Sequence, residues 1–202
     1  MKRESGVLLH ITSLPDGEGI GDLGAAAHAF VDWLVLAGQD WWQMLPCGEV
    51  GFGASPYQSP SAYAGNPSLI SLASLVDIGL LDREMLEPAW INTDAVDFSS
   101  VEAFKSRVLQ KVCSDFEQRA SAHIATEYRE FVAGDEQHWL QDYARFLVLK
   151  SRYGDVPWNE WPEEFSQRNP EALRHFDSEE YRALEATKIT QFLFARQWRE
   201  LR

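Results

Sequence analysis

The chain has 202 residues, a formal net charge of −13 and an apolar fraction of 45%. That apolar fraction is typical of a globular protein, and the acidic charge argues against nucleic-acid and membrane-surface partners, which are themselves anionic. The apolar run at residues 7–11 is too short for a signal-peptide core or a membrane span, and no later stretch is long enough. We therefore expect a cytoplasmic protein whose two cysteines, Cys47 and Cys113, are reduced.

The first 45 residues predict a strand–helix–strand unit. An almost continuously apolar run at 6–11 suits a strand that is buried on both faces. Residues 22–37 place apolar side chains every three or four positions, with Asp22 as the expected N-cap and Gly38 at the left-handed C-terminal cap. Residues 41–45 follow as a second strand, so the unit is expected to be right-handed and parallel.

The segment from residue 46 to residue 67 is a long stretch without sustained periodicity, rich in Gly, Ser, Pro, Tyr and Ala. Loops beyond about 12–15 residues are uncommon in compact domains unless they are functional or disordered. The aromatic residues Phe52, Tyr57 and Tyr63 favour an ordered loop. It also follows a parallel strand, at the end where α/β proteins place ligand sites. The flat face and the hydroxyl of Tyr57 would suit a pyranose ring. The alternative is that the Tyr57 side chain packs against the protein and holds the loop in place.

The remainder of the chain has a mostly helical pattern. A short extended piece is expected at 69–72, and a break rich in Pro and Trp at 157–162. The predicted helices cover residues 99–120, 127–133, 137–152 and 179–202. This region is either an insertion on a barrel or a separate bundle.

Other motifs have simpler interpretations than catalysis. Gly19–Gly24 matches the dinucleotide fingerprint, but it does not directly follow the first strand and Asp22 would face a phosphate, so we reject a nucleotide site. His10 is either a ligand-binding residue or a hydrogen-bonded core histidine. The acidic pairs at 163–164 and 179–180 are interpreted as solvated surface, and no metal-ligand spacing is found.

Several segments taken together resemble the amylomaltase family, glycoside hydrolase family 77 of the α-amylase clan. The segments that resemble the opening of that family are 6–15, 19–24, 42–46, 51–53, 55–59 and 61–67. Those that resemble its helical insertion and the helix leading out of it are 139–144, 157–162 and 191–198. The resemblance covers essentially the whole chain.

This resemblance implies an α/β fold, the N-terminal part of a (β/α)₈ TIM barrel that is incomplete in this chain. It divides the chain into residues 1–75, with the first βαβ unit and the substrate loop; residues 76–178, a helical insertion subdomain; and residues 179–202, a helix that leads back to the barrel. Family members are 4-α-glucanotransferases that transfer α-1,4-glucan segments between maltodextrins with retention, without a metal or organic cofactor.

By the same resemblance, Ser55 and Tyr57 are expected to bind the glucan beside the cleavage point, and Phe52 stands at a secondary glucan contact. The family's catalytic carboxylates are expected after Arg202, so we assign no catalytic residue here. We expect the isolated chain to be inactive and its partners to be maltodextrins and the C-terminal part of the barrel. The alternatives are a non-catalytic glucan-binding or helical interaction module and, more distantly, a nucleotide-dependent enzyme.

Overall fold

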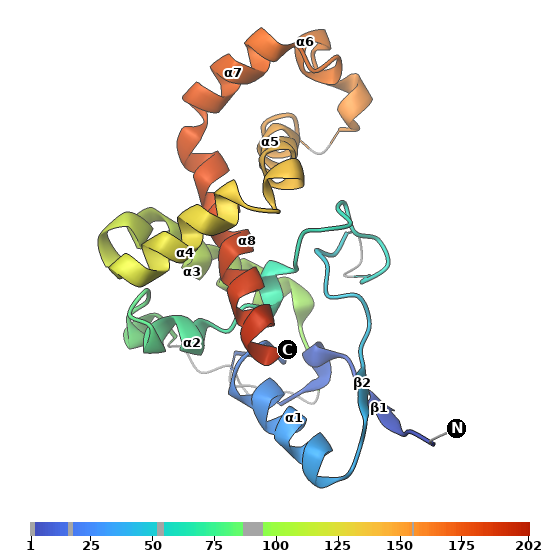
Figure 1. Cartoon of the computed structure of the whole chain (residues 1–202). Coiled ribbons are helices and arrows are strands. Elements are labelled where there is room, and N and C mark those ends of the chain that lie inside the picture. Colours follow the sequence, from blue (N-terminus) through green and yellow to red (C-terminus); the bar gives the residue numbers. More distant parts are fainter. Residues whose placement is uncertain (1–2, 16–17, 52–54, 87–94, 155) are drawn as a thin grey trace. The chain divides into compact units, whose positions relative to one another are not determined.

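The computed structural model describes residues 3–15, 18–51, 55–86, 95–154 and 156–202 (Figure 1). The described chain is mostly helical, with two short strands. It forms two compact units: unit 1 contains Met1–Ser121 and Leu193–Arg202, and unit 2 contains Ala122–Phe192. The division at residues 75 and 178 belongs to the expected barrel architecture and stays a prediction.

Unit 1 begins with the predicted βαβ unit. Strand β1 (Gly6–Leu8) and strand β2 (Trp41–Gln43) are connected through helix α1 (Ala25–Leu36). The strands are parallel, with Val7 opposite Trp42, so the predicted parallel pairing is confirmed. Helix α1 packs on one face of this sheet, where the Phe30 ring meets the Trp42 ring edge-on at a centroid distance of 4.8 Å.

The expectation of a first strand buried on both faces is wrong. The side chain of Leu8 is 61% exposed and that of Trp41 is 62% exposed. The pleat sends Leu8 and Trp41 to the face opposite Val7 and Trp42. Because α1 covers only the Trp42 face, the Leu8 face is left to solvent.

The boundaries of α1 confirm one predicted cap and correct the other. The N-cap is Gly24 rather than Asp22, which lies two residues earlier and is fully buried. At the other end, Gly38 has φ +66°. Its N–H donates to the Val35 carbonyl at 3.1 Å and the Gln39 N–H donates to the Leu34 carbonyl at 2.9 Å, which is the Schellman pattern expected of glycine there.

The other elements of unit 1 follow the long loop or flank it. They are the 3₁₀ helices η1 (Ile11–Ser13), η3 (Pro67–Leu69) and η4 (Arg83–Leu86), the helices α2 (Leu72–Asp77) and α3 (Phe98–Arg119), and the C-terminal part of α8 (Tyr181–Leu201). The helix predicted at 99–120 is confirmed by α3. The extended piece predicted at 69–72 is confined to Ile70 and Ser71, because η3 ends at Leu69 and α2 begins at Leu72.

The regular secondary structure in the described residues of unit 2 is all helical. It contains α4 (Ala122–Ala133), α5 (Gln137–Arg152), η5 (Trp158–Glu160), α6 (Glu163–Ser166), α7 (Pro170–Glu179) and the N-terminal part of α8. The prediction for α5 is confirmed at both ends. Helix α4 begins before the predicted residue 127, and α7 was not predicted.

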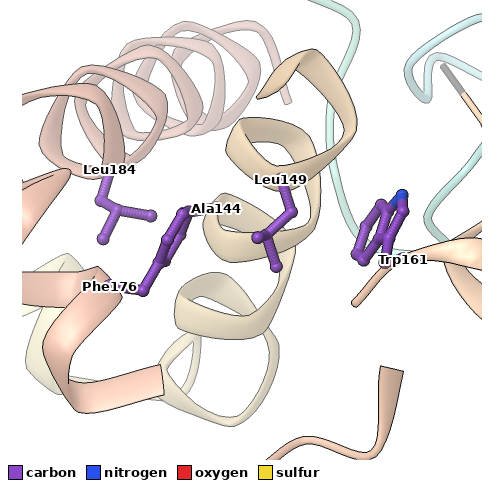
Figure 2. Close-up of a cluster of buried hydrophobic side chains, with 5 residues drawn as sticks. All are labelled: Ala144, Leu149, Trp161, Phe176 and Leu184. Carbon is purple, nitrogen blue, oxygen red and sulfur yellow. The ribbon is translucent and has the colours of Figure 1, made fainter. Parts of the chain in front are cut away.

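The core of unit 2 forms where α5, α7 and α8 meet. One cluster of buried side chains there consists of Ala144, Leu149, Trp161, Phe176 and Leu184 (Figure 2). They come from α5, from the residue after η5, from α7 and from α8. The segment 157–162, which is rich in Pro and Trp, therefore separates the helices and also contributes Trp161 to the core.

Candidate functional site

The long loop of unit 1 is closed at its base. Gly48 and Gly65 form an antiparallel bridge. Beside it, the Glu49 N–H donates to the Ala64 carbonyl at 3.2 Å and the Asn66 N–H donates to the Cys47 carbonyl at 2.9 Å. The described part of the loop therefore leaves β2 and returns to the body of unit 1 at one point, which favours the ordered loop that the aromatic residues predicted.

Two glycines allow the loop to pack this closely. A Cβ at Gly65 would lie 2.0 Å from the Phe194 ring, and a Cβ at Gly51 would lie 2.3 Å from the Gln58 carbonyl oxygen. Both distances are shorter than any tolerated contact, so only a residue without a side chain fits. Phe194 belongs to α8, which means that the last helix holds the end of the loop in place.

Ser55 and Tyr57 form the tip of the predicted substrate site. The Tyr57 N–H donates to the Ser55 hydroxyl at 3.4 Å, and the Gln58 N–H donates to the Ser55 carbonyl at 3.2 Å. This turn presents the Tyr57 side chain to solvent at 72% exposure. The alternative that Tyr57 packs the loop down is therefore wrong. Phe52, the third predicted contact, lies outside the described residues.

Serine hydroxyls stabilise the second half of the loop. The Ser59 hydroxyl donates to the Ser61 carbonyl at 2.7 Å, and the Ser61 hydroxyl accepts from the Tyr63 and Ala64 N–H groups at 3.1 Å. These bonds fix the backbone next to Tyr63, whose side chain is also exposed. Tyr63 thus adds a second outward aromatic to the loop. The sequence had named Tyr63 only as one of the aromatic residues that favour an ordered loop.

His10 lies two residues after β1, at the carboxyl end of the sheet. Within the described residues, its buried Nδ1 has no hydrogen-bond partner. Burial lowers the pKa of the imidazole, which favours the neutral form at neutral pH. The expectation of a hydrogen-bonded core histidine is not met at Nδ1, and the ligand role stays a prediction.

A buried ion cluster joins α3 to the segment that follows the loop and to the residues before α1, and sequence reasoning missed it. The Lys105 ammonium lies 2.9 Å from the Asp22 carboxylate and 2.9 Å from the Glu18 carboxylate, and it donates to the Ile70 carbonyl at 2.8 Å. Burial would lower the pKa of Lys105, but the two carboxylates outweigh it and raise that pKa above its ordinary value. Lys105 is therefore charged at neutral pH.

The same carboxylates organise the backbone around the cluster. Asp22 accepts from the Gly24 N–H at 2.9 Å, and Glu18 accepts from the Leu72 and Ala73 N–H groups at 3.1 and 2.8 Å. The Asp22 carboxylate thus bonds the N–H of Gly24, the N-cap of α1, near the place where the rejected dinucleotide fingerprint would need a phosphate. This arrangement agrees with the rejection of a nucleotide site.

Glu18 and Asp22 are not a candidate acid pair for sugar chemistry. Both carboxylates are almost completely buried and both bond to Lys105. Retaining glycosyl transfer needs one carboxylate open to attack the sugar and one acid able to protonate the leaving group. An interior ion pair can supply neither, so the cluster holds the fold together.

Cys47 lies just outside the bridge at the loop base, and its thiol contacts the Met44 sulfur at 3.6 Å. Burial raises the pKa of this thiol to about 11. Because the thiolate is the reactive species, Cys47 is a poor nucleophile at neutral pH.

In the described part of the chain, no three His, Cys, Asp or Glu side chains gather as a metal site, and no helix is long and apolar enough to cross a bilayer.

A parallel βαβ unit that carries an ordered loop with exposed aromatics at the carboxyl end of its second strand is typical of α/β proteins that bind ligands at that end. Comparison with known proteins identifies the family. Residues 9–202 match the family model described as 4-alpha-glucanotransferase, Glyco_hydro_77. The chain belongs to this family, glycoside hydrolase family 77.

The sequences of individual relatives align with the whole chain. It is 41% identical to a 4-alpha-glucanotransferase of Synechocystis and 40% identical to one of Thermus thermophilus, covering 100% of this chain and 40% of each relative. A solved amylomaltase from Streptococcus agalactiae in complex with acarbose aligns with a TM-score of 0.90 at 35% identity, covering 99% of this chain and 40% of that one. The chain therefore spans about two-fifths of the length of these relatives.

Proposed function

We propose that this chain is the N-terminal portion of a 4-α-glucanotransferase, an enzyme that transfers α-1,4-glucan segments between maltodextrins. The observation that carries the proposal is the family match over residues 9–202. The relative of known structure was solved with acarbose bound, which supports an α-glucan as the class of substrate.

In this proposal the loop between β2 and η3 forms part of the glucan subsites. Tyr57 offers an exposed ring for the C–H face of a pyranose and a hydroxyl for its rim, and Ser55 holds the turn that presents it. Phe52 is proposed as a secondary glucan contact. The nucleophile and the acid/base, which retaining transfer needs about 5–5.5 Å apart, belong to the complete barrel rather than to these residues.

The two-stranded sheet supports a barrel that extends beyond it. Parallel sheets occur almost only with both faces covered, whereas Leu8 and Trp41 are exposed on the face that α1 leaves open. In a (β/α)₈ barrel that face is filled by side chains from the other strands. We propose that residues 76–178 form the helical insertion of this barrel and that the C-terminal part of the barrel is the chain's partner.

A chimera tests the proposal directly. The 202 residues are fused to the part of the Thermus thermophilus relative that follows the aligned region, and the product is incubated with maltotriose. We expect glucose and longer maltodextrins from the chimera and none from the 202-residue chain, because the catalytic carboxylates come with the added part. In the chimera, Tyr57→Ala should lower kcat/KM by about tenfold or more, since it removes a contact to the reacting sugar.

Two results would contradict the proposal at different points. A folded chimera that forms no transfer product would reject the glucanotransferase function. Transfer by the isolated chain would reject its predicted inactivity. Saturable maltodextrin binding by the isolated chain, lost in Tyr57→Ala, with no transfer by the chimera, would instead favour the non-catalytic glucan-binding module.

A further inference from the structure

Unit 2 contains a cavity of about 270 Å³ beside its core, formed by α5, η5, α6 and the start of α7. Its volume lies just below the range of about 300–1,000 Å³ for typical small-molecule sites. The residues of the cavity that matter here are Asp142, Arg145, Trp158, Trp161, Phe165 and Arg168. The cavity belongs to a different unit from the loop that carries Tyr57.

Two tryptophans of the same short segment contribute to the cavity in different ways. Trp161 is buried in the core of unit 2, and its indole N–H donates to the Val156 carbonyl at 3.2 Å. Trp158 is 58% exposed although it lines the same cavity. The fold accounts for Trp161 by packing, whereas the Trp158 ring is available to a ligand.

The charged groups on the polar side of the cavity form ion pairs in which carboxylates balance guanidinium groups. Asp142 pairs with Arg145 at 3.0 Å and with Arg168 at 2.5 Å, and Arg145 also forms a two-point pair with Asp177 at 2.8 and 2.6 Å. Burial would raise the pKa of Asp142, but the two guanidinium groups lower it below its ordinary value, so Asp142 is ionised at neutral pH. Asp177 is not among the lining residues, but its carboxylate balances the charge of Arg145. The two carboxylates and two guanidinium groups therefore give an ionic ligand no net attraction, while they offer donors and acceptors to hydroxyl groups.

Arg168 occupies a backbone position where glycine is expected. It has φ +56°, and among the described non-glycine residues it is the one with a positive φ. The N–H groups of Arg168 and Asn169 donate to the carbonyls of Phe165 and Glu164 at 3.0 and 2.8 Å, which makes Arg168 the left-handed residue of a Schellman cap on α6. A side chain is unfavourable there. The backbone therefore does not explain an arginine whose guanidinium lies at the cavity.

We propose that this cavity binds one neutral pyranose unit, such as the end residue of an α-1,4-glucan. The C–H face of the sugar stacks on Trp158, and its hydroxyls bond to Asp142 and Arg168. An anionic sugar is disfavoured because both arginines of the cavity are already paired with carboxylates and the chain carries −13 overall. The class of ligand rests on the proposed function, whereas the cavity and its open tryptophan do not.

Maltose binding by the 202-residue chain tests this site. All titrations use a Tyr57→Ala background, so that the loop of unit 1 does not contribute, and binding is followed by calorimetry. We expect saturable binding that Trp158→Ala weakens by about tenfold, which corresponds to 1.4 kcal/mol. Tyr181→Ala is the matched control, because Tyr181 is 57% exposed in the same unit and does not line the cavity. It should leave the affinity unchanged.

Arg168 provides a second, independent test. Arg168→Gly keeps and relaxes the left-handed cap of α6, so the variant should fold, while it removes the guanidinium from the cavity. We expect the maltose affinity to fall in Arg168→Gly with an unchanged circular dichroism spectrum. The same titrations with glucuronate should show no tighter binding than with glucose.

The outcomes separate this site from the proposed function. No saturable response to maltose up to about 100 mM, or an affinity unchanged by both Trp158→Ala and Arg168→Gly, would overturn the site. Tighter binding of glucuronate would overturn the neutral ligand. Maltose binding that depends on Trp158 in a chain whose chimera shows no transfer would leave the site standing and reject the glucanotransferase function.

Discussion

The Lys105 ammonium holds two buried carboxylates, those of Glu18 and Asp22, at 2.9 Å each. Replacing it by an apolar side chain of similar length, in Lys105→Met, leaves both carboxylates buried without their cation. Breaking a buried ion pair in this way costs about 3–5 kcal/mol. We therefore expect the free energy of unfolding to fall by about this amount, measured by urea denaturation followed by circular dichroism.

The matched control lies on the same helix. Lys111 pairs with Asp115 one turn away, and its side chain is largely exposed. Lys111→Met should change the free energy of unfolding by no more than about 1 kcal/mol. Because the pKa of Lys105 is raised, its stabilisation is present below the ordinary pKa of 10.5 and is lost as the pH rises through the folded value. A similar loss in both variants between pH 6 and 9 would contradict the buried role of Lys105.

Arg168 allows the backbone cost of a positive φ to be measured. Arg168→Ala and Arg168→Gly both remove the ion pair with Asp142, but only the glycine relaxes the left-handed backbone. The glycine variant should therefore be more stable than the alanine variant by about 1 kcal/mol, measured by urea denaturation. Equal stabilities would show that φ +56° at this position carries no strain.

At the scale of elements, Asp97 governs the N-terminus of α3. Hydrogen bonds from the Ser100 hydroxyl, the Ser100 N–H and the Ser99 hydroxyl lower the pKa of Asp97 to about 2. A lowered folded pKa means that the stabilisation is present above the ordinary value of 3.8 and is lost as the pH falls through about 2. The cap should therefore weaken between pH 4 and pH 2.

Asp97→Asn separates this titration from those of the other carboxylates. Asparagine also caps helices, but it does not ionise. The difference in urea midpoint between the wild type and Asp97→Asn should be constant above pH 5 and should shift in favour of Asn between pH 4 and pH 2. A difference that is independent of pH over this range would show that Asp97 does not cap α3 as an anion.

The sequence predicted those elements whose signals are local. Helix α5 was predicted at both ends because its apolar period runs through 16 residues, and the end of α1 because glycine is the residue that a left-handed cap needs. The extended piece predicted at 69–72 is limited to Ile70 and Ser71, since a short apolar run does not distinguish a strand from a helix. Helix α7 was missed although Asn169 and Pro170 are a recognisable helix start.

The sequence located the candidate loop, but not the side chains that hold it and its surroundings in place. Its length, its composition and its place after the second strand single out residues 46–67, whereas the glucan-binding role of Tyr57 comes from the family resemblance and stays a prediction. The ion cluster could not be found this way, because Lys105 looks like an exposed helix lysine and its partner Asp22 is 83 positions away. The sequence also did not predict that Trp158 is exposed while Trp161 is buried, since both belong to one short segment.

At the scale of the whole molecule, the open face of the sheet links this chain to the barrel proposed for it. Leu8 and Trp41 lie on the face that α1 does not cover. A two-stranded sheet also has two unpaired edges, which are sites for pairing with other chains. We infer that the isolated chain associates with itself unless the remaining strands cover this face.

Leu8→Asn tests this inference because its effect should depend on the context. In the isolated 202-residue chain the Leu8 side chain is 61% exposed, so the substitution should change the free energy of unfolding by no more than about 0.5 kcal/mol and should reduce self-association in sedimentation velocity. In the chimera with the Thermus thermophilus relative, the same side chain is expected to be buried by neighbouring strands. There the substitution should cost about 2–3 kcal/mol, because it removes an apolar side chain and buries an amide. An equally small effect in both contexts would mean that this face is not the interior of a barrel.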